Sequence, residues 1–314
     1  MAVREVASDV EPPAPARPGA RRMLVGLVRL ARPHQWIKNV LVLAAPAAAG
    51  VLDQREPFVE TGIAFAAFCL AASGTYFLND VADVAADRAH PVKRRRPVAA
   101  GVVPVGLARA LGVVLVAAGI AVGFLAGGVE LPAVVGGYVA LTTAYSYGLK
   151  SVAVVDLVCV AAGFVLRAVA GAVATDVPIS DWFFIVASFG SLFMVAGKRH
   201  AEQLDLGDLA AGVRPTLGKY SPSFLNYLSA VSSGTVLVAY CLWAFERAEE
   251  VGGGFPWYQV SILPFVMGIL RYALLLDAGR GAAPEDVVLG DRALQLIGVA
   301  WAVCFGAGVY VLHP

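Results

Sequence analysis

Long apolar stretches alternate with short polar segments from residue 37 to residue 312 of the chain. A helix needs about 20 apolar residues to cross the hydrocarbon core of a bilayer. Nine stretches approach or exceed that length, and they cover residues 37–52, 58–79, 102–126, 129–148, 152–174, 180–197, 224–245, 257–277 and 293–312. The pattern predicts an all-α integral membrane protein with nine transmembrane helices. The first is short and contains Pro46, so the pattern defines its ends poorly.

The composition agrees with a membrane protein and excludes an ordinary soluble domain. Hydrophobic residues make up 59% of the 314 positions, and charged residues only 15%. The net charge is +1, and we expect a bilayer and no nucleic acid as the partner. Residues 1–20 contain four prolines and no apolar run, which predicts a disordered cytoplasmic tail before a single catalytic domain over residues 21–314. Single cysteines lie in four different spans, as packing residues would: Cys69, Cys159, Cys241 and Cys304.

Basic residues orient the predicted spans. If the N-terminus is cytoplasmic, 21 of the 24 Lys and Arg residues fall on the cytoplasmic side, which is the bias expected of bacterial plasma-membrane proteins. Arg55 and Arg247 fall on the other side, and Arg167 lies within a span. Nine spans then place the C-terminus outside.

An acidic cluster follows the second apolar stretch, in the segment YFLNDVADVAADRAH. On a continuous helix its four polar side chains span an arc of roughly 100°, so their oxygens can converge on one cation. Oxygen donors without His or Cys suit Mg²⁺, held by a few carboxylates and completed by substrate phosphates. The alternative is a solvated polar turn between two helices. The candidate metal ligands are Asn79, Asp80, Asp83 and Asp87.

A second charged segment, GKRHAEQLD, follows the sixth apolar stretch. Lys198 and Glu202 lie on one face of a continuing helix, and Arg199 flanks them. The alternative is a basic cap whose long side chains reach the membrane surface. Transporters tend to place ionisable groups near the middle of the bilayer, whereas both charged segments here lie at the cytoplasmic rim.

The two segments together resemble the UbiA-type superfamily of intramembrane prenyltransferases, over nearly the whole chain from Leu30. The carrying motif is the NDxxDxxxD pattern of Asn79, Asp80, Asp83 and Asp87, followed by the charged segment after the sixth span. The resemblance implies nine helices around a central cavity open to the cytoplasm, with the first acidic motif binding Mg²⁺ and a diphosphate.

One departure from the family pattern changes the expected substrate. Typical members carry a second acidic motif where this chain has Lys198, Arg199 and Glu202, so two acids have largely given way to cations. This is similar to the phosphoribosyltransferase branch. That branch moves phosphoribose from 5-phosphoribosyl 1-diphosphate to a polyprenyl (decaprenyl) phosphate, releasing diphosphate, for arabinan precursors of the cell wall. Its substrates carry a diphosphate and two separate phosphates, which suit one Mg²⁺ site plus several Lys and Arg.

Two further groups of candidate residues, besides the metal ligands, follow from these patterns. Catalytic roles are expected for Asp80, Asp83, Asp87, Lys198 and Arg199. Substrate contacts are expected from Lys38, Asn79, Arg94, Arg95, Tyr145, Lys150, Arg167 and Glu202. Arg94 and Arg95 could instead grip anionic headgroups, and Tyr145 and Lys150 could be interfacial anchors. A homo-oligomer is possible. The alternatives are an aromatic prenyltransferase that uses a prenyl diphosphate, and a membrane transporter.

Overall fold

The structure, a computed structural model, describes residues 19–206, 216–252, 254–279 and 284–311. Every regular element in these ranges is a helix. The predicted tail of residues 1–20 lies outside them except for its last two residues. The α-helices are α1 (Ala20–Ala31), α2 (Ala44–Ala48), α3 (Arg55–Ala82), α4 (Val84–Ala89), α5 (Val105–Gly123), α6 (Glu130–Tyr147), α7 (Val155–Ala174), α8 (Asp181–Leu206), α10 (Pro222–Val251), α11 (Trp257–Asp277), α12 (Pro284–Gly290) and α13 (Arg292–Val311). The short 3₁₀ helices are η1 (Pro33–Leu43), η2 (Lys93–Arg95), η3 (Phe124–Ala126), η4 (Leu149–Ser151) and η6 (Leu217–Lys219).

Seven helices in the described residues are long and apolar enough to cross a membrane: α3, α5 with η3, α7, α8, α10, α11 and α13. Two predicted spans differ. The stretch 37–52 forms the 3₁₀ helix η1 followed by the five-residue α2. The stretch 129–148 forms α6, an 18-residue helix that is too polar to be one of the seven. Its Thr142, Tyr145 and Ser146 side chains line a polar cavity, which explains why its hydropathy is low.

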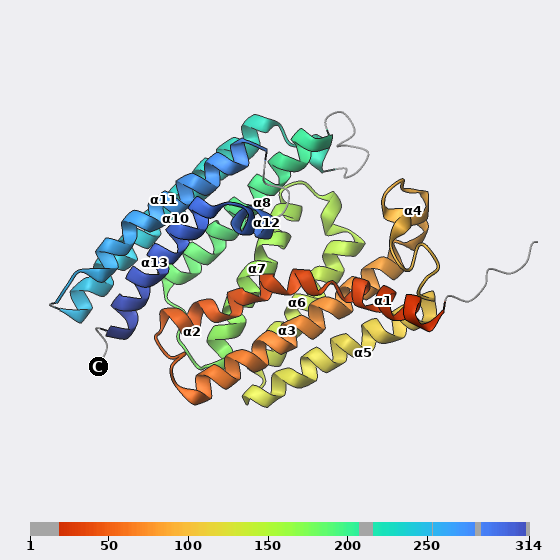
Figure 1. The fold of residues 1–314 in the computed structure, drawn as a ribbon, viewed down its shortest axis with the longest axis horizontal. Helices are drawn as coiled ribbons and strands as arrows, with labels where there is room; N and C mark the ends of the chain where they lie inside the picture. The colour runs from red at the N-terminus through yellow and green to blue at the C-terminus, as the bar shows by residue number, and fades with distance from the viewer. Residues whose placement is uncertain (1–18, 207–215, 253, 280–283, 312–314) are drawn as a thin grey trace, which may run out of the picture.

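The helices pack closely where side chains are small. Helices α3 and α5 run side by side (Figure 1) because glycines meet between them. A Cβ at Gly119 of α5 would stand 2.8 Å from the Ala67 carbonyl oxygen of α3. Small residues at such contacts let helix backbones approach in a membrane. A Cβ at Gly171 of α7 would lie 1.7 Å from the Val42 oxygen, so α7 packs directly on the backbone of η1.

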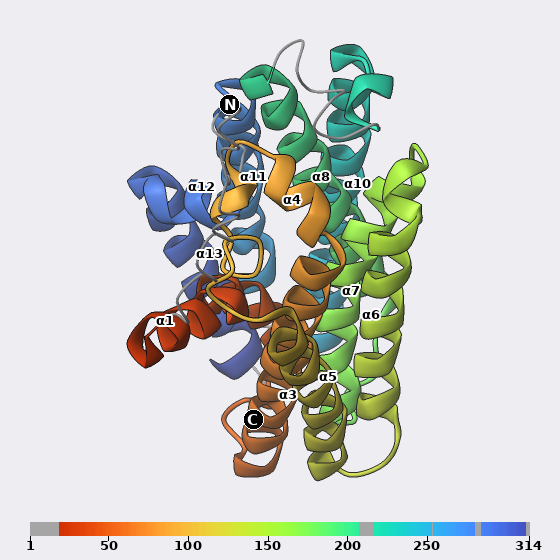
Figure 2. The ribbon, with the colours of Figure 1, turned by 90° about the vertical axis from the view of Figure 1, so that its right-hand side faces the viewer.

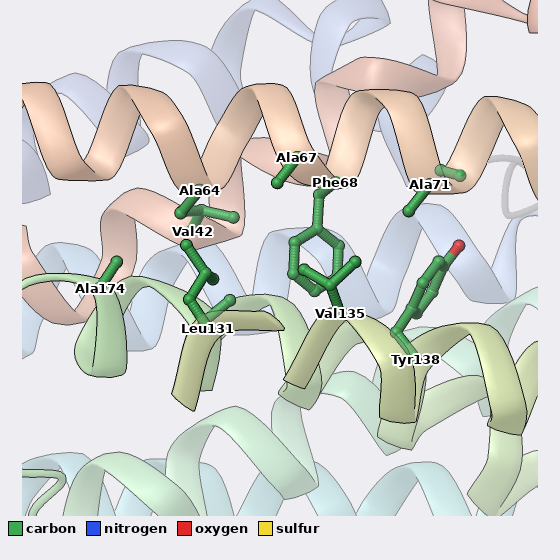
Figure 3. Close-up of a cluster of buried hydrophobic side chains, with 11 residues drawn as sticks. Val42, Ala64, Ala67, Phe68, Ala71, Leu131, Val135, Tyr138 and Ala174 are labelled. Atoms are coloured by element: carbon green, nitrogen blue, oxygen red, sulfur yellow. The ribbon is translucent and has the colours of Figure 1, made fainter. Parts of the chain in front are cut away.

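A buried cluster joins α3, α6, α7 and η1 beneath the polar cavity (Figure 3). The rings of Phe68 and Tyr138 lie between α3 and α6, with centroids 5.2 Å apart. Val42 is fully buried in the same cluster. This cluster fixes the spacing of the four elements, all of which also line the polar cavity.

Two breaks in the helical path lie beside the site. Arg32 adopts a left-handed conformation, φ 50°, between α1 and η1, and α1 extends away from the bundle (Figure 2). Asp83 ends α3, and α4 starts anew at Val84. The backbone therefore turns where Arg32 and the acidic motif come together.

Candidate functional site

A polar cavity of about 480 Å³ lies between α3, α6 and α7, with η1 and η4 at its sides. Its wall is rich in charge for a bundle of apolar helices. Among the described residues six cationic side chains line it against two acidic ones. The cations are Arg32, Lys38, Lys93, Arg96, Lys150 and Arg167, and the acids are Asp80 and Asp83. An excess of cations in a concave site favours substrates with several negative charges.

The acidic side of the cavity comes from the end of α3. Asp80 is 2% exposed, and one of its carboxylate oxygens accepts hydrogen bonds from Arg32 at 2.8 Å and from Arg96 at 3.3 Å. Asp83 is more open, with 43% of its side chain exposed, and it lies 3.7 Å from Lys150 Nζ. The Arg32 guanidinium also stands over the Tyr76 ring, 4.6 Å from its centroid. The acids thus face both the cavity and a set of cations.

Asp87 lies apart from the other three predicted metal ligands. Because α3 ends at Ala82, the motif is not carried on one continuous helix as the sequence pattern assumed. Asp87 is buried on α4, accepts a 2.9 Å hydrogen bond from Arg96, and is not part of the cavity wall. The structure brings Asn79, Asp80 and Asp83 to the cavity and gives Asp87 the task of holding Arg96.

The remaining donors fit a magnesium ion that has few protein ligands. In the described residues no three His, Cys, Asp or Glu side chains form a metal site by themselves. Two carboxylates and one amide, from Asp80, Asp83 and Asn79, line the cavity at the end of α3. Mg²⁺ in such sites keeps several waters and takes substrate phosphate oxygens as the other ligands.

Other predicted substrate contacts also reach the cavity. Lys38 comes from η1, Tyr145 from α6, Lys150 from η4 and Arg167 from α7. The basic run after α4 contributes differently from the prediction. Its first and last members, Lys93 and Arg96, line the cavity. Arg94 and Arg95 are exposed and do not line it, so the interpretation as headgroup contacts stays open for them.

The second charged segment lies outside the cavity wall. Among the described residues the wall includes none of Lys198, Arg199 and Glu202. Arg199 is 2% exposed, donates to Glu202 at 2.8 Å, and lies 3.6 Å from Asp156 Oδ2. This position points to a structural role for Arg199, since a guanidinium enclosed between two carboxylates has little surface left for a phosphate.

Asp156 is the centre of this buried network. It is fully buried at the start of α7 and accepts hydrogen bonds from the Tyr220 hydroxyl and, at 3.1 Å, from Thr216 Oγ1. Tyr220 also accepts a 2.7 Å hydrogen bond from the amide of Val154, a β-branched residue held at φ 69°. Burial, and then the bond to Asp156, raise the pKa of Tyr220 to about 12, so the phenol stays protonated.

This network fixes η4 and its Lys150 beside the cavity. Thr216 Oγ1 and Lys219 Nζ reach the backbone oxygens of Lys150 and Ser151 at 3.4 and 3.5 Å. We define the Asp156 latch as Asp156, Arg199, Thr216 and Tyr220. Asp156 lies at the start of α7 and was not among the residues expected at the site. Its partners come from sequence positions 43 to 64 residues away, so no local pattern could reveal them.

Several further residues of the wall were missed. Tyr138 and Thr142 line the cavity beside the predicted Tyr145, and the spacing of four and three residues places all three on one face of α6. That polar stripe in an otherwise apolar helix was visible in the sequence. Arg96 carried no such signal, because its three basic neighbours hide it in a uniform run.

An apolar groove adjoins the polar cavity. Two cavities of about 470 and 460 Å³ share Leu41, Phe183 and Trp301 and form one groove between η1, α8, α11 and α13. Phe164 of α7 lines both this groove and the polar cavity. The site therefore combines the cation-rich polar cavity with a neighbouring apolar groove that is suited to a hydrocarbon chain.

This combination of an all-helical membrane fold, an acidic motif and a cationic chamber defines an intramembrane transferase of the UbiA class. The chain belongs to the UbiA prenyltransferase family, whose sequence profile matches residues 40–294.

Within that family, relatives that are 43–46% identical to this chain carry the name decaprenyl-phosphate phosphoribosyltransferase. The Corynebacterium glutamicum protein of that name is 46% identical over 291 residues, covering 91% of this chain and 87% of the relative. The Mycobacterium tuberculosis protein is 46% identical over 292 residues, covering 91% and 95%. A UbiA homologue from Archaeoglobus fulgidus bound to GPP and Mg²⁺ matches the fold with a TM-score of 0.66 at 17% identity, over 91% of this chain and 99% of the homologue.

Proposed function

We propose that this protein transfers the 5-phosphoribosyl group from 5-phosphoribosyl 1-diphosphate to a polyprenyl phosphate, decaprenyl phosphate in the named relatives. The observation that carries the proposal is the charge of the cavity, in which six cations accompany two carboxylates. The donor brings a diphosphate and a 5-phosphate, and the lipid brings a further phosphate. A prenyl diphosphate with an aromatic acceptor would bring less negative charge to this excess of cations.

The reaction requires no strong base. The bond between the anomeric carbon of ribose and the diphosphate oxygen breaks, and its electron pair leaves with the diphosphate. An oxygen of the lipid phosphate, already ionised at neutral pH, forms the new bond to that carbon. Catalysis then rests on holding the two substrates in line and on neutralising the charge that develops on the leaving group.

The chain's residues divide these tasks. Asn79, Asp80 and Asp83 would hold Mg²⁺, which supplies charge neutralisation to the departing diphosphate. Lys93 and Arg96 stand beside that acidic side of the cavity, where they can contact donor phosphates. Lys150, next to Asp83, serves the same end, and the Asp156 latch keeps its backbone in place.

The lipid acceptor and the membrane complete the proposal. The apolar groove beside Phe164 can take part of the polyprenyl chain. We place the cavity at the cytoplasmic face, with the N-terminus inside and the C-terminus outside, in a bundle of nine membrane-associated segments that counts η1 with α2 and α6 among them. The distribution of Lys and Arg supports this orientation.

A transfer assay tests the function. The purified protein receives Mg²⁺, labelled 5-phosphoribosyl diphosphate and decaprenyl phosphate in detergent micelles. We expect labelled lipid-linked phosphoribose and released diphosphate, and no product when EDTA is added. A parallel reaction offers geranyl diphosphate and an aromatic acid. Prenyl transfer in that reaction, with no ribosylated lipid in the first, would overturn the assignment.

A further inference from the structure

The two most buried arginines of the described structure differ in how their charge is balanced. Arg199 is 2% exposed and lies between the carboxylates of Asp156 and Glu202. Arg167 is 5% exposed, and in the described part of the chain no carboxylate comes within the 4.0 Å ion-pair distance of its guanidinium. A buried charge without a counter-ion is costly, and within a membrane span it usually marks a ligand path.

Neutral groups hold Arg167 in place from three elements. Its guanidinium donates to Asn39 Oδ1 of η1 at 2.8 Å, to the Tyr138 hydroxyl of α6 at 3.1 Å, and to the Gly163 carbonyl of α7 at 2.5 Å. These bonds use three of the five N–H donors of an arginine. The guanidinium also stands over the Tyr138 ring, 4.7 Å from its centroid. Arg167 is thus fixed in orientation, keeps donors to spare, and lines the cavity.

The surroundings of Arg167 indicate which anion would bind there. Phe164, one turn earlier on α7, lines both the polar cavity and the apolar groove. The guanidinium lies 5.8 Å from its ring centroid and 5.7 Å from that of Phe68. An anion at Arg167 therefore has an apolar surface beside it. The phosphate at the head of a hydrocarbon chain fits such a place, whereas the sugar phosphate donor is polar throughout.

We propose that Arg167, held by Asn39 and Tyr138, binds the phosphate of the lipid acceptor and so separates the acceptor site from the donor site at Asp80 and Asp83. This proposal rests on the function proposed above. It assigns Arg167, a buried cavity cation with no carboxylate within ion-pair distance in the described residues, to the substrate that arrives from the bilayer. The bound phosphate would supply the missing negative charge.

Kinetics with each substrate varied separately test the assignment. The variant is Arg167→Met, which keeps the volume and removes the charge. We expect the Michaelis constant for decaprenyl phosphate to rise about 10- to 100-fold, the effect of losing one charge-assisted contact. The Michaelis constant for the donor should change by less than about twofold. A rise in the donor constant with an unchanged acceptor constant would contradict the proposal.

A binding measurement without donor separates this proposal from the proposed function. Decaprenyl phosphate should raise the melting temperature of the wild-type protein more than decaprenol, which lacks the phosphate. The difference should vanish in Arg167→Met and persist in Arg109→Met, the loss of an exposed arginine of α5 that lines neither the polar cavity nor the apolar groove. If the difference persists in Arg167→Met, the site is elsewhere. If the wild-type protein shows no activity in the transfer assay, the proposed function is rejected. The binding measurement would still test whether Arg167 binds the lipid phosphate.

A second variant covers the case in which Arg167→Met does not fold, since the arginine also ties η1 to α6 and α7. Arg167→Lys keeps the charge but loses the planar fork of donors. We expect an acceptor Michaelis constant above that of the wild type and a reduced preference for phosphate over alcohol. If a folded Arg167→Lys protein keeps both the wild-type acceptor Michaelis constant and the wild-type preference for phosphate over alcohol, the inference is overturned.

Discussion

Asp83 is the more exposed of the two carboxylates in the cavity, with 43% of its side chain open, and it has Lys150 as its neighbour. Asp80 is enclosed by Arg32 and Arg96. Substitutions of Asp80 and Asp83 therefore test different properties of the site. Loss of Asp80 disturbs two arginines as well as any bound ion, whereas loss of Asp83 removes a charge from the cavity with little effect on packing.

Asp83→Asn is accordingly the sharper test of the metal site. The substitution preserves size, so we expect unfolding stability within about 0.5 kcal/mol of the wild type. Turnover should fall about 100-fold or more, because several kcal/mol of leaving-group stabilisation depend on the metal ligands. Rates measured across a Mg²⁺ titration check this. Glu250→Gln, an exposed acid paired with Arg247 on α10, is the control. Activity above a tenth of the wild type at unchanged Mg²⁺ dependence would rule out the ligand role.

Neighbouring cations of the basic run offer a matched pair. Lys93 lines the cavity and Arg94 points outside it. We expect Lys93→Ala to raise the donor Michaelis constant about tenfold, through loss of one phosphate contact at the cavity rim. Arg94→Ala should have a smaller effect. Equal effects of the two substitutions in steady-state kinetics would show that the run acts as a diffuse charge, without a defined contact.

At the scale of helices, the Asp156 latch connects the start of α7, the end of α8 and the segment before α10. Its members are buried, and the Tyr220 hydroxyl accepts a hydrogen bond from the amide of Val154, whose positive φ is rare for a β-branched residue. The latch keeps η4 beside the cavity. The residues that directly follow α8 in sequence lie outside the described structure.

Tyr220→Phe tests the latch. The change removes one hydrogen bond to the Asp156 carboxylate and leaves the Val154 amide without its acceptor, so we expect a loss of about 1 to 3 kcal/mol of stability. Thermal unfolding measures it, with Tyr227→Phe as the control because Tyr227 is 65% exposed on α10. A drop in turnover should accompany the loss, since Lys150 is less well placed. If Tyr220→Phe has the same melting temperature as the wild type, the latch does not contribute to stability.

The stability contributed by the Tyr220 hydroxyl depends on pH, and the direction of that dependence follows from the pKa of Tyr220. The folded pKa of Tyr220 is about 12, above its ordinary value of 10. The stabilisation by the phenol is therefore complete below pH 10 and is lost as the pH rises toward 12. The difference in melting temperature between the wild type and Tyr220→Phe should narrow over that range. A difference that grows above pH 10 would contradict the protonated phenol.

For the whole molecule, the central prediction is the orientation in the membrane. Helix α10 has 30 residues, about 45 Å, so its two ends lie on opposite sides of a bilayer. Lys219 lies just before its start, and Glu250 lies near its end. In intact cells we expect Glu250→Cys to react with a membrane-impermeant thiol reagent, and Lys219→Cys to react only after the cytoplasmic face is opened. The reverse labelling would overturn the orientation and the cytoplasmic site.

The sequence by itself determined the class of the protein. Spans of apolar residues and a local acidic motif predicted the all-helical membrane fold, and the family profile and fold neighbours confirm it. Hydropathy along one segment is a local property, and it therefore predicts where α3, α5, α7, α8, α10, α11 and α13 run. The resemblance to the phosphoribosyltransferase branch is matched by relatives at 46% identity.

Only the tertiary structure decided how the charged groups pair. Because α3 ends at Ala82, Asp87 lies on α4, pairs with Arg96 and is not part of the cavity wall, and a helical wheel drawn through the motif cannot show this break. Arg199 lies in a charged segment and Arg167 lies alone in an apolar span, and neither local sequence shows which groups balance the charge. In the described part of the folded protein Arg199 lies between two carboxylates, whereas Arg167 has only neutral partners. Charge balance depends on which helices meet, and that is a property of the packed bundle.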